Sequence, residues 1–299
     1  MIGYNLKNIS GGFLVDKPVG ITARGVDNKI GRLLKTRRVG HIGTLDPNAS
    51  GLLPVLVGKA TRIAPYVDAG IKGYRAEITL GKTTDTDDIE GNVIDESPVQ
   101  VAPSRIYEEL LKFVGEIEQV PPKYSAKKVD GVPMYRRARR GEDVIIQPKR
   151  VVIYSIDSVE IDIPKIRFDI VCGTGTYLRA IARDIGYRLG CGGFLSALKR
   201  VSVGKHKVEN AVPLDEILRS IRDGEPQKYL LSEIEMLPHL QKVKVDEIGA
   251  WQVLHGQIVK NLDIHLKPET LFAILSEDGR LLAIAEKIPG RYKYRRVLT

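Results

Sequence analysis

The chain has 299 residues, of which 43% are apolar and 28% are charged, a composition typical of a folded globular protein. Its formal net charge of +9 favours a polyanionic partner. No apolar run approaches the roughly 20 residues needed to cross a bilayer, and the N-terminus lacks the pattern of a secretory signal. The two cysteines and five histidines show no disulfide or metal-ligand spacing. We therefore expect a cytoplasmic protein with no membrane contact and no metal.

The first half of the chain mixes strand and helix patterns. Residues 13–15 predict a buried strand that runs into a Pro/Gly turn. Thr22 can cap a following helix whose apolar positions share one face. Residues 74–80 alternate between apolar and polar side chains, which predicts a half-buried strand. An acidic loop at residues 83–93 follows, and a second helix is expected from Pro103.

The second half of the chain predicts further strands, a helix and a separate tail. Residues 166–172 alternate as a strand, and a helix is expected over residues 176–189. Residues 270–288 are typical of a hairpin. We therefore predict a mixed α/β (α+β) fold over residues 1–240. A small, β-barrel-like C-terminal domain is expected over residues 241–299.

A basic segment interrupts this pattern at residues 121–150. It holds nine Lys/Arg against three acidic residues, with Tyr124 and Tyr135 interleaved. Such a segment offers cations for phosphates and ring faces for unpaired bases. We predict nucleic-acid contact here, with Lys128 and Arg139 among the contacting residues, although a merely solvated helix-loop element would have a similar composition.

One carboxylate stands out in the segment GHIGTLDPNASG. Because Asp46 precedes Pro47, the pair predicts a turn that presents the carboxylate outward. Taken alone, this pattern favours an ordinary capping turn over a catalytic group. The P-loop, dinucleotide-binding, HExxH and GxSxG motifs are all absent, so ATP chemistry is not indicated.

Six segments occur in an order that changes this interpretation. They are DKPVG, GHIGTLDP, KGYRAEITLGKTTDTDDIEG, QVPPKYSAKKVDG, CGTGTYLRAIARDIG and LSALKRVSVG. Together they closely resemble the TruB family of pseudouridine synthases, from about residue 12 to residue 204. This resemblance implies the pseudouridine synthase fold, with a predominantly antiparallel sheet. The tail from about residue 243 resembles the small PUA-like RNA-binding domain that ends many members.

The resemblance implies three catalytic residues. Asp46 would be the nucleophile that attacks the uridine, and Arg179 would be the cation that pairs with it. Tyr74 would stack on the target base and help remove the proton from C5. Without the resemblance, Tyr74 would be a core residue and Arg179 a surface residue, although the apolar positions around Arg179 indicate a partly buried site.

The resemblance also implies further residues around the substrate. His41 would lie next to the everted nucleotide, and Leu198 and Tyr177 would line the pocket. Asp88 would orient polar groups of the pocket, with loop capping as the alternative. Lys17 would support the active-site loop.

The implied reaction is the conversion of a uridine in the T-loop of tRNA, at position 55, to pseudouridine. This isomerisation needs neither cofactor nor metal, and the protein would bind the tRNA T-arm as a monomer with no obligate protein partner. Two alternatives stay open. One is the related guide-RNA-dependent synthase that acts mainly on ribosomal RNA, against which the basic segment argues. The other is a non-catalytic RNA-binding or RNA-folding protein that keeps the same scaffold.

Overall fold

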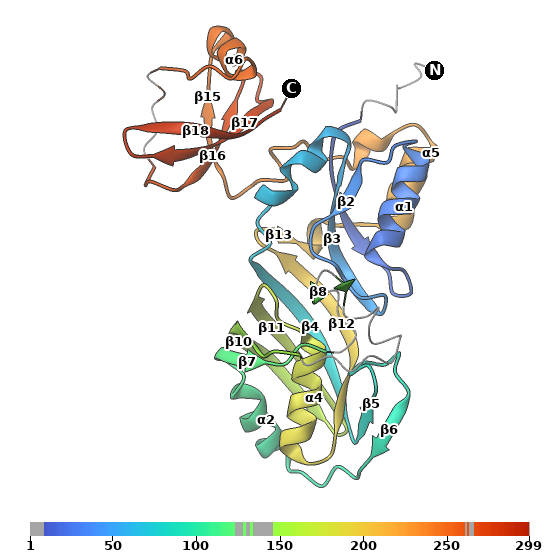
Figure 1. Cartoon of the computed structure of the whole chain (residues 1–299). Helices are drawn as coiled ribbons and strands as arrows, with labels where there is room; N and C mark the ends of the chain where they lie inside the picture. Colours follow the sequence, from blue (N-terminus) through green and yellow to red (C-terminus); the bar gives the residue numbers. More distant parts are fainter. Residues whose placement is uncertain are drawn as a thin grey trace.

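The computed structural model describes residues 9–122, 128–129, 132–133, 146–260, 262 and 266–298. A long twisted sheet forms its body, and a second, small sheet lies at the C-terminal end (Figure 1). Most of the basic segment at residues 121–150 lies outside the described residues, including Arg139 and the side chain of Lys128.

The large sheet contains ten strands in the order β14-β1-β3-β12-β4-β11-β10-β7, with β13 beside β12 and β2 beside β3. Its strands are β1 (Gly11–Lys17), β2 (Val39–His41), β3 (Ala49–Val57), β4 (Ile71–Leu80), β7 (Gly115–Gln119), β10 (Lys149–Asp162), β11 (Lys165–Gly173), β12 (Gly193–Val203), β13 (His206–Lys207) and β14 (Val212–Pro213). Only the pairs β1–β14 and β3–β12 are parallel among its described strands. The predicted mixed fold with a mainly antiparallel sheet is therefore confirmed.

Four helices share one apolar core with this sheet. They are α1 (Ala23–Leu33), α2 (Pro103–Leu111), α4 (Leu178–Leu189) and α5 (Leu214–Arg222). The side chain of Thr22 accepts a hydrogen bond from the amide of Gly25, as expected for the cap of α1. Gly190 ends α4 in the left-handed conformation, at φ 72°. On β4, Tyr74, Ala76, Ile78 and Leu80 are buried in the predicted alternation.

The acidic stretch after β4 is more ordered than the loop expected from the sequence. It folds as a hairpin of β5 (Lys82–Thr84) and β6 (Val93–Glu96). The tip of this hairpin is tied to β12, because the amide of Ile89 donates to the carbonyl of Leu195 at 3.1 Å. A further short hairpin pairs β8 (Lys128–Val129) with β9 (Val132–Pro133).

The C-terminal sheet has the order β15-β16-β17-β18 and carries helix α6. These elements are β15 (Gln241–Lys244), α6 (Glu247–Leu254), β16 (Leu271–Leu275), β17 (Leu281–Ile288) and β18 (Arg291–Val297). The expected hairpin is the pair β16–β17. The small C-terminal β domain is confirmed, and its boundary at residue 240 stays a prediction.

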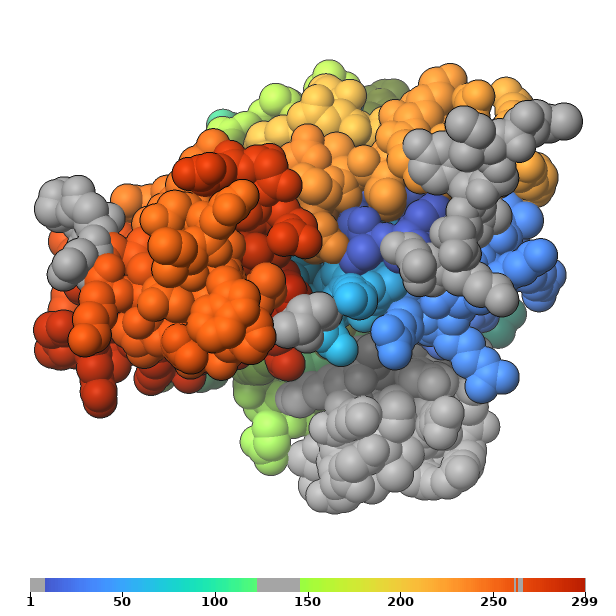
Figure 2. All heavy atoms as spheres, turned by 90° about the horizontal axis from the view of Figure 1, so that it is seen from above, coloured from blue at the N-terminus to red at the C-terminus, as the bar shows by residue number. Residues whose placement is uncertain are grey.

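The two sheets are not independent of each other. Side chains of β1 and β3 share an apolar core with η2 (Gly58–Tyr66) and with the inner face of β16 and β17. Figure 2 shows the orange and red C-terminal atoms beside the cyan atoms of the first hundred residues. The hydroxyl of Tyr66 also donates to the carbonyl of Arg295 at 3.1 Å. The small C-terminal sheet is therefore packed against the large sheet and η2. Two further short 3₁₀ helices, η3 (Val208–Asn210) and η4 (Pro226–Lys228), lie in connections of the described chain.

Candidate active site

Asp46 lies in a turn directly before β3. Its main-chain carbonyl accepts a hydrogen bond from the amide of Ala49 at 3.1 Å. This bond closes a four-residue turn with Pro47 at the second position. The side chain is 47% exposed, so the turn presents the carboxylate outward, as the sequence predicts.

Arg179 approaches Asp46 from a distant part of the chain. It sits in the first turn of α4, and its side chain is only 8% exposed. Its Nη2 lies 3.1 Å from Oδ2 of Asp46, and its Nη1 lies 3.4 Å from Oδ2 of Asp88. The guanidinium therefore joins two carboxylates from two loops, which compensates for its burial.

Asp88 is the more buried of the two carboxylates, with 13% of its side chain exposed. Its Oδ1 accepts hydrogen bonds from the hydroxyl of Thr86 at 2.6 Å and from the amide of Glu90 at 3.0 Å. Asp88 therefore caps its own loop and also contacts Arg179, while a role in orienting polar groups of the pocket stays a prediction.

A hollow of about 260 Å³ opens beside these groups. Its walls include Asp46, Tyr74, Tyr177, Arg179 and Leu198. Residues from β4, β12, α4 and the loop before β3 thus meet at one place. An acid, a cation, a phenol and an apolar wall around a small hollow suit a single planar base.

Burial changes the chemistry of Tyr74. It is 8% exposed, and burial raises the pKa of its phenol to about 12, with the nearby Arg200 opposing this rise. The phenol is therefore neutral near neutral pH. A neutral ring is a good stacking surface and a poor base.

Lys17 contacts the loop that carries Asp46. It is fully buried, and its Nζ donates to the carbonyls of Pro18 at 2.9 Å, Ile21 at 2.8 Å and Pro47 at 3.2 Å. Burial lowers the pKa of Lys17 to about 8, which the Asp46 carboxylate opposes. Its ammonium ties β1 to the turn that follows Asp46.

His41 lies at the end of β2, one loop before Asp46. Its Nδ1 is 2.8 Å from Oδ2 of Asp27, and its Nε2 is 3.3 Å from the hydroxyl of Thr44. Thr44 belongs to the wall of the 260 Å³ hollow. His41 is thus linked to the hollow through Thr44.

Known proteins match nearly the whole chain. The protein named tRNA pseudouridine synthase B of Geotalea uraniireducens (strain Rf4) is 39% identical over 292 residues, which span 95% of this chain and 94% of the relative. Its namesake from Burkholderia lata is 41% identical over 284 residues, or 94% of this chain and 88% of the relative. The chain belongs to the TruB family of tRNA pseudouridine synthases. It is therefore an RNA-modifying isomerase that converts uridine to pseudouridine.

Two family profiles place this TruB assignment along the chain. The TruB family pseudouridylate synthase N-terminal domain matches residues 31–178. The tRNA pseudouridylate synthase B C-terminal domain matches residues 179–237. The boundary between them falls between Leu178 and Arg179, so each profile supplies one partner of the Asp46–Arg179 ion pair.

Solved structures share the TruB-type fold. A chain from a Cbf5-Nop10-Gar1 complex matches with a TM-score of 0.75 and 25% identity, covering 99% of this chain and 86% of that chain. A chain from an H/ACA RNP bound to a substrate RNA containing 2′-deoxyuridine has the same TM-score of 0.75 at 24% identity, covering 100% and 87%. Both agree with the present fold across the catalytic sheet and the C-terminal domain.

Two buried polar residues of this TruB-family site were not singled out from the sequence. Arg200 on β12 is fully buried and donates to the carbonyls of Gly43 at 2.9 Å, Thr44 at 3.5 Å and Leu52 at 2.8 Å. Gln119 at the end of β7 is 2% exposed and bonds both the amide and the carbonyl of Tyr177. Neither contact leaves a local signal in the sequence, because each joins segments of the chain that are distant in sequence.

No group of three or more His, Cys, Asp or Glu among the described residues is arranged to hold a metal ion. Cys172 and Cys191 are both buried free thiols. Within the same part of the chain, no helix is both long and apolar enough to span a membrane.

Proposed function

We propose that this chain converts the uridine at position 55 in the T-loop of tRNA to pseudouridine, with Asp46 as the nucleophile. The observation that carries this proposal is the half-exposed carboxylate of Asp46, paired with the buried Arg179 at 3.1 Å in the wall of a base-sized hollow. A cation at this distance stabilises the ionised form that a nucleophilic carboxylate needs.

The bond changes balance without any added reagent. Asp46 attacks C1′ of the target uridine as the bond between N1 and C1′ breaks, and the released uracil turns within the hollow. C5 then bonds to C1′ and displaces the carboxylate of Asp46, after which C5 loses its proton and N1 gains one. Because the product is an isomer of the substrate, we propose that no cofactor or metal takes part.

The hollow supports this sequence of events. A target base must leave its stack to enter it, which costs a few kcal/mol, and the ring of Tyr74 and the side chain of Leu198 can restore contact on its two sides. Because a neutral phenol is a poor base, we assign stacking to Tyr74 first. Its help in removing the C5 proton stays a prediction.

We further propose that the chain acts alone on tRNA, as a monomer in the cytoplasm, without a guide RNA. The relatives named tRNA pseudouridine synthase B are 39% and 41% identical, whereas the chains from the H/ACA RNP and the Cbf5-Nop10-Gar1 complex are 24% and 25% identical. The basic segment at residues 121–150 and the C-terminal β domain would supply contacts to the tRNA arm.

The test uses the purified chain and unmodified tRNA transcripts, with pseudouridine mapped at single-nucleotide resolution. We expect pseudouridine at position 55 alone, and none in a matched transcript that carries cytidine at this position. Product that appears only with an added guide RNA would overturn the stand-alone proposal. RNA binding without any product would favour an RNA-folding protein.

A further inference from the structure

The buried face of α1 contains one unexpected residue. Five residues of this helix are buried, and four of them are Ala23, Val26, Ile30 and Gly31. The fifth is Asp27, with a side chain only 2% exposed. A carboxylate at such a position is costly unless it is paired, so its contacts show what it does.

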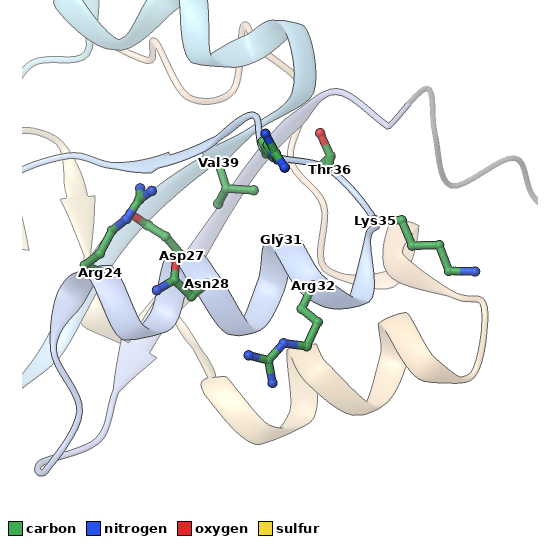
Figure 3. Close-up of a pocket in the computed structure, with 9 residues that line it drawn as sticks. Arg24, Asp27, Asn28, Gly31, Arg32, Lys35, Thr36 and Val39 are labelled. Carbon is green, nitrogen blue, oxygen red and sulfur yellow. The ribbon is translucent and has the colours of Figure 1, made fainter.

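Asp27 lies at the edge of a second hollow, of about 430 Å³, which is lined by α1, the loop after it and Val39. Figure 3 shows Arg24 and Asp27 turned toward each other on this helix, with Val39 of β2 nearby. Arg24 reaches Oδ2 of Asp27 at 3.3 Å, but its own side chain is 68% exposed. An exposed partner at this distance does not compensate for the burial of the carboxylate.

The stronger contact is with His41. Nδ1 of His41 lies 2.8 Å from Oδ2 of Asp27, and the His41 side chain is 18% exposed. Oδ1 of Asp27 has no hydrogen-bond partner among the described residues. Within the described part of the chain, Oδ2 therefore makes both polar contacts of the Asp27 carboxylate. The shorter of these two contacts is to the ring of His41.

This contact continues to the catalytic hollow. Because a carboxylate only accepts hydrogen bonds, Nδ1 of His41 must carry the proton. Nε2 is then directed to the hydroxyl of Thr44 at 3.3 Å, and Thr44 lines the hollow together with Asp46. A line of polar contacts thus runs from the buried face of α1 to the pocket wall.

We propose that Asp27 is a positioning residue for the known reaction. It fixes the protonated Nδ1 of His41, so that the opposite edge of the ring faces Thr44 and the RNA that enters the pocket. The effect on catalysis rests on the proposed function, whereas the state of the ring can be measured without substrate.

The first arm of the test is spectroscopic. Histidine labelled with ¹⁵N reports which ring nitrogen carries a proton, and the signal of His41 is identified by its loss in His41→Gln. At about pH 8, where a free imidazole is neutral, we expect Nδ1 of His41 to carry a proton in the native chain and in Asp27→Asn, whose side-chain oxygen can still accept. In Asp27→Val we expect a mixture of both tautomers. An unprotonated Nδ1 in the native chain would overturn the proposal, even if the valine variant did not fold.

The second arm is kinetic and uses tRNA as substrate. Asp27→Val should raise KM about tenfold and change kcat less than about threefold, because the ring loses orientation and not chemistry. In the His41→Ala background the same substitution should change kcat/KM less than about twofold. Independent effects that multiply would show that Asp27 acts through something other than His41.

Arg24→Gln serves as the matched control. It removes the other partner of Asp27 and should leave both the His41 signal and kcat/KM as in the native chain; a loss equal to that of Asp27→Val would assign the role to the Arg24 pair. A native chain that forms no pseudouridine would refute the proposed function, while the spectroscopic arm would still decide the Asp27–His41 contact.

Discussion

Arg179 and Arg200 are both buried near the loop that carries Asp46, yet their main partners differ. Arg179 pairs with the carboxylates of Asp46 and Asp88. Arg200 donates to the main-chain carbonyls of Gly43, Thr44 and Leu52, and it also interacts with the phenol of Tyr74. The first arginine sets the charge beside the reacting carboxylate, and the second holds the backbone that carries it.

Lys17 belongs with Arg200 in this comparison, because the hydrogen bonds of its ammonium within the described part of the chain go to main-chain carbonyls. Gly51 shows how closely the backbone is held around them. Its φ is +96°, and a Cβ at this position would lie 2.3 Å from the carbonyl oxygen of Arg200. The site thus separates two tasks, charge compensation and backbone support, between different cations.

Removal of the charge-setting arginine should have the largest effect on the chemistry. In Arg179→Ala, Asp88 stays buried without its cation and Asp46 loses its ion pair. We expect kcat to fall on the order of 1,000-fold, equal to about 4 kcal/mol, and the free energy of unfolding to fall by about 3 kcal/mol. Single-turnover kinetics and urea denaturation measure the two quantities.

Arg183→Ala is the matched control on the same helix. Arg183 pairs with Asp87 and Asp184 and is 29% exposed, so its loss should leave kcat within about threefold of native. Equal losses of kcat in the two variants would remove the distinction drawn for Arg179.

Removal of the backbone-supporting arginine should reverse the balance between stability and catalysis. Arg200→Met removes a donor from one buried and two partly buried carbonyls, which should lower the free energy of unfolding by about 3 kcal/mol. Because Asp46 keeps its ion pair, kcat should fall only about tenfold. Lys199→Met, at the exposed neighbouring position on β12, should change neither quantity. A fall in kcat as large as that of Arg179→Ala would contradict the division between charge compensation by Arg179 and backbone support by Arg200.

A smaller, pH-dependent effect should come from Lys17. Its pKa is lowered to about 8, whereas in the unfolded chain it is about 10.4. Between these values the unfolded state binds more protons, so the contribution of Lys17 to stability rises with pH. Catalytic activity should fall over the same pH range. A neutral amine has two hydrogens for three carbonyls, so it holds the Asp46 turn less firmly.

The measurement is the pH profile of kcat together with that of the free energy of unfolding. The native chain should lose kcat above about pH 8 while this part of its stability rises. Lys17→Met should have a lower kcat with no decline in that range. An unchanged alkaline decline in the variant would assign the titration to another group.

The sequence allowed much of this site to be predicted, for physical reasons that differ between residues. The alternation on β4 placed Tyr74 on the buried face, and the Asp46-Pro47 pair predicted the turn. The resemblance to the TruB family predicted that Arg179 pairs with Asp46. Arg200 could not be found in this way, because its burial depends on the strands that flank β12. Asp27 was equally hidden, since a single acid on a helix is usually a solvated residue.

The most direct test of the account is the activity of Asp46→Asn, a change that keeps the size of the side chain and removes its charge. With tRNA carrying uridine at position 55, we expect a loss of pseudouridine formation on the order of 10⁴-fold, while tRNA affinity and the free energy of unfolding stay close to those of the native chain. Pseudouridine formed at position 55 at a rate near that of the native chain would contradict the assignment of Asp46 as the nucleophile.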